Sequence, residues 1–343
     1  MQALPRLSLL FTIGALTPAV QAQDFSFTSD QSSSNYTWSG TTSLGPLNGN
    51  PSNTFQLSGT LSLELGGGGA PVGSGQWIST DLLVVPDLSG IIPNPIQGLP
   101  PLATIDVEGM RFSISSDPFS VDGAGAFDTT TVLEVTSGLL TVTPLVGAAT
   151  MTDLTGTMGD PTPTSGTITR NGSDLEFASP MNTQFDFTDT TSGISATINL
   201  NGNLVADYTC EPAANYCGTS PNSVGAGAVM GTSGSTFMAD NNFSLTASGA
   251  PANKPGLFFV GPNQVSVPLG DGVRCVGGSI KRLGVVFSNG SGVFDRPIDF
   301  TSPPNNAVFE PGVEYNFQCW YRDQAAGGAG FNLSDATNVT FCP

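Results

Sequence analysis

The chain of 343 residues is acidic and rich in turn-forming residues, with a formal net charge of −18, 43 glycines and 26 prolines. Because glycine and proline both disfavour helices, this composition excludes a mainly helical fold and favours short strands joined by turns. A charge this negative repels phosphate backbones, and nucleic acid is therefore excluded as an expected partner.

The first 22 residues have the pattern of an export signal. Arg6 supplies the positive flank, residues 7–16 form a short apolar run, and Val20-Gln21-Ala22 places small residues at the cleavage spacing. We expect cleavage near Ala22 and a secreted or cell-surface protein in which disulfides can form. No later apolar run has the length of a membrane span, so none is expected.

Charge is distributed unevenly along the mature chain, which favours two domains. Residues 23–210 contain two basic and eighteen acidic residues, whereas residues 211–343 contain six basic and nine acidic ones. We therefore expect an acidic β-rich domain over 23–210 and a C-terminal β-sandwich over 211–343, a division that the chain length also allows.

Alternation of apolar and polar residues with a period of two predicts strands throughout the acidic domain. The clearest runs are residues 55–65 and 194–204. Further strands are expected at residues 104–108, 111–115, 130–136, 139–143, 166–170 and 184–187. This number of strands predicts a large antiparallel sandwich or barrel.

Residues 86–101 contain five prolines among apolar residues. Proline removes a hydrogen-bond donor from the sheet, so this segment is predicted to be a loop or an edge crossing and not a central strand. It could fold over the core of its own domain or form an exposed apolar contact loop. Both interpretations remain open from the sequence.

The C-terminal domain contains strand-like runs separated by Gly-, Pro- and Asn-rich turns. Strands are expected at residues 243–247, 256–260, 264–267, 279–286, 292–300, 315–321 and 339–341. Seven short strands in this length suggest an immunoglobulin-like or jelly-roll sandwich. The whole chain is thus predicted to be all-β, with two antiparallel β domains.

The same region carries a series of short motifs. They are Tyr216-Cys217, Pro221-Asn222-Ser223, Phe258-Phe259, Cys275-Val276-Gly277-Gly278, Phe317-Gln318-Cys319-Trp320-Tyr321-Arg322-Asp323 and Phe331-Asn332-Leu333-Ser334-Asp335. In this order the motifs resemble an uncharacterised C-terminal β module of secreted bacterial proteins, over about residues 216–343. The resemblance implies export and a β fold, and it implies no activity.

Five cysteines in an exported chain favour disulfides over zinc ligands or nucleophiles. We expect Cys217–Cys342, which would tie the first and last strands of the module, and Cys275–Cys319, which would cross between its sheets. Cys210 is then free or intermolecular, and a local Cys210–Cys217 loop is the alternative pairing.

The sequence contains no histidine, which excludes Ser-His-Asp and Cys-His catalysis and His-ligated metals. The remaining catalytic candidates are two pairs of carboxylates at i and i+2, Asp106 with Glu108 and Asp174 with Glu176. Each pair would lie on one strand face, at a spacing that glycoside hydrolysis can use. The alternative is a solvated strand face with Ile105 and neighbouring apolar side chains pointing inward.

No cofactor is expected, with calcium as the possible exception. Oxygen-rich turns occur at Asp122-Gly123, Asp271-Gly272 and Asp186 with Asp189, but none has the twelve-residue spacing of a calcium loop. Aspartate in such turns commonly accepts hydrogen bonds from its own backbone instead.

These observations favour an exported, non-catalytic structural, adhesive or interaction protein at the cell exterior, whose partner is an extracellular protein or glycan. The alternative is a carbohydrate-binding or carbohydrate-active protein that uses carboxylates of the acidic domain. Converging carboxylates and an exposed Trp38 or Trp77 would favour that alternative, because aromatic rings and paired acids bind and cleave sugars. Scattered acids would favour the first interpretation.

Overall fold

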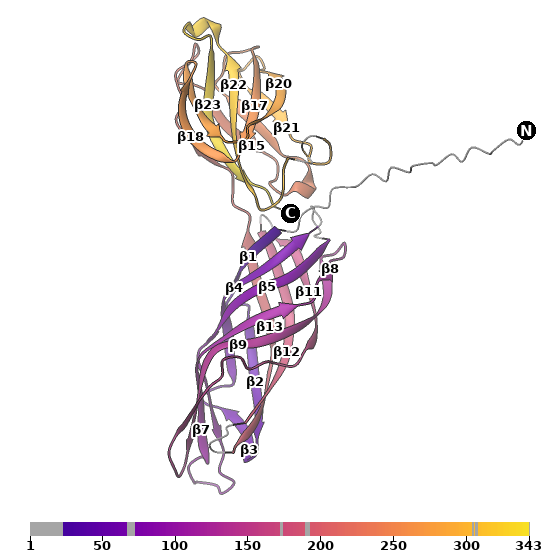
Figure 1. The fold of residues 1–343 in the computed structure, drawn as a ribbon, viewed down its shortest axis with the longest axis vertical. Coiled ribbons are helices and arrows are strands. Elements are labelled where there is room, and N and C mark those ends of the chain that lie inside the picture. Colours follow the sequence, from indigo (N-terminus) through magenta and orange to yellow (C-terminus); the bar gives the residue numbers. More distant parts are fainter. Residues whose placement is uncertain are drawn as a thin grey trace, which may run out of the picture.

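The computed structural model describes residues 23–66, 73–171, 174–188, 193–303, 305 and 308–342. The expected export signal and its cleavage point near Ala22 lie outside these residues. The described chain is all-β, as predicted, and none of its helices is long and apolar enough to cross a membrane. Two elongated parts lie end to end, coloured indigo to pink and orange to yellow in Figure 1.

Among the described residues, thirteen strands form one antiparallel sheet in the first part. They are β1 (Gln23–Ser29), β2 (Asn35–Thr42), β3 (Gly45–Gly49), β4 (Thr54–Gly66), β5 (Ser74–Val85), β6 (Leu88–Ile92), β7 (Ala103–Ser116), β8 (Phe119–Ser120), β9 (Ala126–Pro144), β10 (Thr150–Asp153), β11 (Thr162–Asn171), β12 (Asp174–Thr188) and β13 (Ser195–Thr209).

The hydrogen-bonded ladder of this sheet returns to its starting point. It runs from β4 through β5, β7, β9, β11, β12 and β13, and β13 then pairs with both β1 and β2, which pair with β4. The short strands β3 and β6 fill the gap between β2 and β7 at the end far from the second part. We call the first part the closed sheet.

Two of the long strands join segments that the sequence predicted to be separate. Residues 104–108 and 111–115 both belong to β7, and residues 130–136 and 139–143 both belong to β9. Gly109 in β7 has a φ of +60°, and the register between the two strands shifts next to it. Such an irregularity interrupts the alternation without ending the strand, because glycine accommodates the left-handed backbone of a bulge.

The proline-rich segment is also partly a strand. β6 pairs with β3 on one side and with β7 on the other, so the prediction that residues 86–101 form only a loop or edge crossing is wrong for residues 88–92. Pro86 and Pro93 flank this strand and do not interrupt it, so its backbone donors remain available for the ladder.

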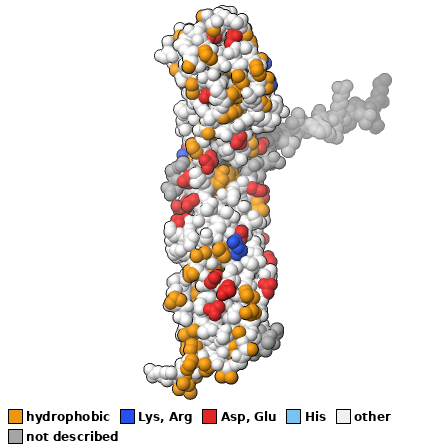
Figure 2. All heavy atoms as spheres, turned by 90° about the vertical axis from the view of Figure 1, so that its left-hand side faces the viewer, with side chains coloured by type: hydrophobic (Ala, Val, Ile, Leu, Met, Phe, Trp, Pro, Cys, Tyr) orange, Lys and Arg blue, Asp and Glu red, His pale blue; other side chains and the backbone are white. Residues whose placement is uncertain are grey.

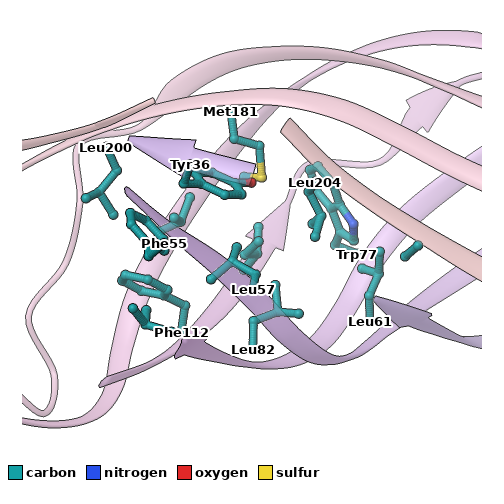
Figure 3. Packing of buried hydrophobic residues seen from close by; sticks show 14 of the residues in the cluster. Tyr36, Phe55, Leu57, Leu61, Trp77, Leu82, Phe112, Met181, Leu200 and Leu204 are labelled. Carbon is teal, nitrogen blue, oxygen red and sulfur yellow. The ribbon is translucent and has the colours of Figure 1, made fainter. Parts of the chain in front are cut away.

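The interior of the closed sheet is filled by apolar side chains from all sides. Figure 3 shows Tyr36, Phe55 and Phe112 from three different strands meeting in one layer, with Leu57 and Leu82 beside them. Because inward positions alternate with outward ones along each strand, closing the ladder places every inward side chain in a shared core. Burial of this surface is the main force that holds the closed sheet together.

The second part contains three smaller sheets. Their strands are β14 (Ala214–Tyr216), β15 (Val229–Ser233), β16 (Ser244–Ser248), β17 (Pro255–Gly261), β18 (Asn263–Leu269), β19 (Gly272–Gly277), β20 (Lys281–Phe287), β21 (Phe294–Pro297), β22 (Glu314–Arg322) and β23 (Phe331–Thr340). Short 3-10 helices lie at η1 (Met238–Asp240) and η3 (Gln324–Ala326).

These sheets pack in layers around the five-stranded sheet β14-β23-β22-β17-β20. On one face, an aromatic core that includes Phe258, Phe317 and Phe341 is shared with the sheet β15-β16-β21. On the other face, Cys275 and Val276 of the β18–β19 hairpin pack against Leu333. The five-stranded sheet is therefore covered on both faces.

This double coverage explains part of what strand prediction missed in the second part. β23 begins at Phe331, although only residues 339–341 were predicted, and β19 was not predicted as a strand. Residues 332–337 of β23 are all buried, so the strand has no alternation of buried and exposed positions. A period of two reveals only strands with one solvated face.

The disulfides differ from the predicted pairing. Cys210 is bonded to Cys342 and Cys217 to Cys275, while Cys319 is a buried free cysteine. The predicted bonds Cys217–Cys342 and Cys275–Cys319 are therefore wrong. The prediction that Cys210 is free or intermolecular and the alternative Cys210–Cys217 bond are wrong as well.

The alternation of side chains along β22 explains why Cys319 is not bonded to Cys275. Cys319 points with Phe317 into the aromatic core on one face of the five-stranded sheet. Cys275 lies in the cluster on the opposite face. Cys217 follows β14 on that same face, where the Tyr216 hydroxyl donates a 3.1 Å hydrogen bond to the carbonyl of Cys275.

The two parts meet at a junction built around Arg170 of β11. Its guanidinium is 2.5 Å from the Asp240 carboxylate, donates to the Ser235 hydroxyl at 3.2 Å, and lies 3.9 Å from the centre of the Phe237 ring. Phe237 also packs in the core of the closed sheet, together with the Cys210–Cys342 disulfide. The junction thus combines covalent, ionic and apolar contacts.

Candidate interaction surface

Two loops at the far end of the closed sheet, residues 93–102 and 145–149, are together called the tip. They follow β6 and β9 and project from the end opposite the second part (Figure 1). The loops touch through a 2.8 Å hydrogen bond from the Leu145 amide to the Leu102 carbonyl. The Leu102 amide in turn donates to the carbonyl of Ile92, which anchors the tip to β6.

The tip exposes large apolar side chains and carries no charge. Val146 is 87% exposed and Ile96 is 63% exposed, and Leu99 and Leu145 are also exposed. Residues 93–102 and 145–149 include no Asp, Glu, Lys or Arg, in a chain whose net charge is −18. Figure 2 shows hydrophobic side chains gathered at this lower end, whereas acidic side chains lie along the body.

Sequence reasoning found only half of this surface. The sequence left two interpretations of the proline-rich segment open, and each is correct for part of it. Ile96 and Leu99 are exposed, as in a contact loop, whereas Leu88 and Ile92 are buried in the core. Residues 145–149 were not identified, although an apolar, uncharged turn between two strands is itself a signal. What the sequence could not show is that β7 and β9 are neighbours, which brings the two loops together.

The two carboxylate pairs lie on different strands and do not converge. Asp106 and Glu108 are on β7, where Asp106 accepts a 2.6 Å hydrogen bond from the Ser89 hydroxyl. Asp174 and Glu176 are on β12, opposite residues of β13. In both pairs the acids are at least partly exposed, and an adjacent apolar residue, Ile105 or Leu175, is buried, as expected for a solvated strand face. Val107, between Asp106 and Glu108, is half-buried.

The carbohydrate alternative would be favoured by an exposed Trp38 or Trp77, and both side chains are buried. Trp38 is 3% exposed and Trp77 is 1% exposed. Trp77 packs against three phenylalanine rings inside the closed sheet. Neither ring can therefore stack on a sugar at the surface. Glu176 of β12 pairs with Asp207 of β13, and burial together with the charges of Glu176, Asp30 and Asp174 raises the pKa of the Asp207 carboxyl.

The aspartates of the candidate calcium turns accept hydrogen bonds from neighbouring groups. Asp122 accepts from the amides of Ala124 and Ala126 at 2.8 and 2.9 Å, and these bonds lower the pKa of its carboxyl. Asp271 accepts from the Ala329 amide at 2.9 Å. Asp189 is outside the described residues, within which no cluster of three or more acidic or cysteine side chains is placed to hold a metal. Calcium binding stays a prediction.

The motifs of the C-terminal module form a buried polar network. The Gln318 side chain accepts from the Cys275 amide at 2.9 Å and donates to the carbonyls of Val273 and Ser334 at 2.8 and 2.7 Å. The Asp335 carboxylate accepts from the Met230 amide. These side chains connect the five-stranded sheet to the layers on both sides, so the described motif residues specify packing.

Comparisons with known proteins identify no relative by sequence. No family model matches the chain, and no curated protein matches it. Among solved structures, the chain is similar to the "tetra-tandem repeat in extending region of large adhesion protein", with 10% identity and a TM-score of 0.23, over 96% of this chain and 98% of that one. A likeness at this level carries no argument about fold or function.

Proposed function

We propose that this protein is an exported, rod-shaped interaction protein that makes its contact through the tip. The observation that carries this proposal is an exposed, uncharged apolar surface at the end of an acidic rod. Contiguous exposed apolar side chains mark interaction sites, and the centres of protein interfaces are depleted of charge. The partner is then an apolar area on another protein at the cell exterior.

The body behind the tip supports this role. Long paired strands make the closed sheet a spacer, and the junction at Arg170 fixes it to the second part. Two disulfides are typical of proteins in oxidising compartments, which agrees with an extracellular location. The motif network stabilises the second part, so its described residues serve the fold.

The test is binding of labelled mature protein to the cells that export it. Changing Leu99→Asp together with Val146→Asp should weaken binding at least about tenfold, because each buried apolar side chain contributes about 1.5–3 kcal/mol. A matched control, Val285→Asp with Phe287→Asp, changes two exposed apolar residues on β20 and should bind as the wild type does.

Treatment of the cells before binding distinguishes the classes of partner. Loss of binding after protease treatment would agree with a protein partner. Binding that survives protease and disappears after periodate oxidation would show a glycan partner instead. If the tip variant binds as tightly as the wild type, the tip is not the contact surface.

A further inference from the structure

A groove crosses the outer face of the closed sheet over strands β13, β2 and β4. Its volume is about 620 Å³, within the roughly 300–1,000 Å³ of sites that hold small molecules. Tyr36 and Phe55 of these strands point into the core, where their rings stack (Figure 3). The side chains beside them point outward and line the groove, which we call the amide groove. They are Asn201 and Asn203 of β13, Asn35 and Thr37 of β2, and Thr54 and Gln56 of β4.

The register of the three strands arranges these polar side chains in rows. Asn201 lies opposite Thr37, which in turn lies opposite Thr54. Asn35 lies opposite Gln56 in the next row. Because strands in a ladder have a fixed spacing and alternate their side chains between the two faces, the rows hold their polar groups at fixed positions on one surface.

The two sides of the amide groove differ in their hydrogen bonds. The Gln56 amide donates to the side-chain oxygen of Asn35 at 3.1 Å, and the Asn35 amide donates to the Ser32 carbonyl at 2.8 Å. These two side chains are therefore held in place. On β13, the side chains of Asn201 and Asn203 form no hydrogen bond with another described residue. Their donors and acceptors are free to bind a ligand.

The lining of the amide groove limits the class of ligand. Its residues are all uncharged, although residues 23–210 contain eighteen acidic residues. An uncharged site neutralises no ion, and the acidic body repels anions. Carboxamide and hydroxyl groups together donate and accept hydrogen bonds, which matches the hydroxyl groups of a sugar. Val85 and Pro86 add an apolar border that the C–H groups of a sugar ring can contact.

We propose that the amide groove binds an uncharged glycan chain, whose hydroxyl groups exchange hydrogen bonds with Asn201 and Asn203. The groove is lined by no carboxylate, so it binds the glycan without the paired acids that glycoside hydrolysis requires. This site lies on strand faces of the closed sheet, is separate from the tip and does not depend on the tip's function.

The test is an NMR titration of the full mature protein with five uncharged hexasaccharides: cellohexaose, maltohexaose, mannohexaose, xylohexaose and N-acetylchitohexaose. At least one should shift the side-chain amide resonances of Asn201 and Asn203 and reach saturation. The resonances of Asn48 and Asn199, two exposed asparagines outside the groove, should stay in place. Hexagalacturonate, an acidic hexasaccharide, should produce no saturable shift, because the acidic body repels it.

Two double variants and the tip variant complete the test. Asn201→Ala with Asn203→Ala should weaken binding of the hexasaccharide at least about tenfold, since it removes two or more hydrogen bonds. Asn48→Ala with Asn199→Ala, the matched control, should bind as the wild type does. Both double variants should keep the wild-type melting temperature, because the changed side chains lie outside the core.

The tip variant, Leu99→Asp with Val146→Asp, should also bind the hexasaccharide as the wild type does, so a failure of the tip as a contact surface leaves this result unchanged. The proposal is overturned if no uncharged hexasaccharide gives a saturable shift at Asn201 and Asn203. It is equally overturned if the variant that lacks both amides binds as tightly as the wild type.

Discussion

At the scale of single residues, the direction in which a side chain points decides its chemistry. Cys319 and Gln318 are neighbours on β22, yet Cys319 enters the aromatic core while Gln318 enters the polar network on the other face. Burial raises the pKa of the Cys319 thiol far above its usual value. Since the thiolate is the reactive form, this cysteine should be inert in the folded protein.

The inertness of Cys319 gives a direct test of the disulfide pairing. Folded, unreduced protein should not react with a maleimide, and unfolding without reductant should expose one reactive thiol per chain. Peptide mapping should find the label on Cys319. A label on Cys210 would contradict the pairing seen in the structure.

At the scale of strands, glycines permit close approaches between neighbours in the closed sheet. Gly59 in β4 has a φ of +149°, and a Cβ atom at this position would overlap the carbonyl oxygen of Asp81 in β5. β4 and β5 pair over almost their whole length. The backbone conformation and the contact with Asp81 both require a residue without a side chain.

Gly59→Ala should therefore lower the free energy of unfolding by about 2 kcal/mol or more, since a strained backbone alone costs about 1–3 kcal/mol. Gly290→Ala is the matched control, because a Cβ there would meet no atom within 4 Å. The control should change stability by less than about 0.5 kcal/mol. Denaturant unfolding measures both, and equal effects of the two changes would contradict the account of Gly59.

At the scale of the whole molecule, the junction connects two parts that share no sheet. Arg170 is one of only two basic residues between positions 23 and 210, and it contacts Asp240 of the second part. Hydrogen bonds from Ser235 and Arg170 lower the pKa of the Asp240 carboxyl below its usual value of 3.8. The ionised carboxylate therefore stabilises the folded protein when the pH is above the usual pKa of the carboxyl. This stabilisation is lost as the pH falls through the lowered pKa.

The junction thus predicts a pH-dependent effect of Asp240→Asn. This variant should have a lower melting temperature than the wild type at pH 6, and the difference should shrink as the pH is lowered below 3.8, the usual pKa of the carboxyl. Asp117→Asn, a change at an exposed aspartate, should show no such pH-dependent difference. If the difference in melting temperature between the wild type and Asp240→Asn stays constant with pH, the ionic contact is not its cause.

The sequence by itself determined the all-β class and the positions of strands with one solvated face, such as residues 55–65, because alternation is a local property. Tertiary structure decided that the ladder closes, that the tip loops meet, and that Cys342 bonds to Cys210. These features depend on which strands are neighbours and which face each side chain occupies. Both are set by contacts between residues far apart in the chain, which local periodicity does not contain.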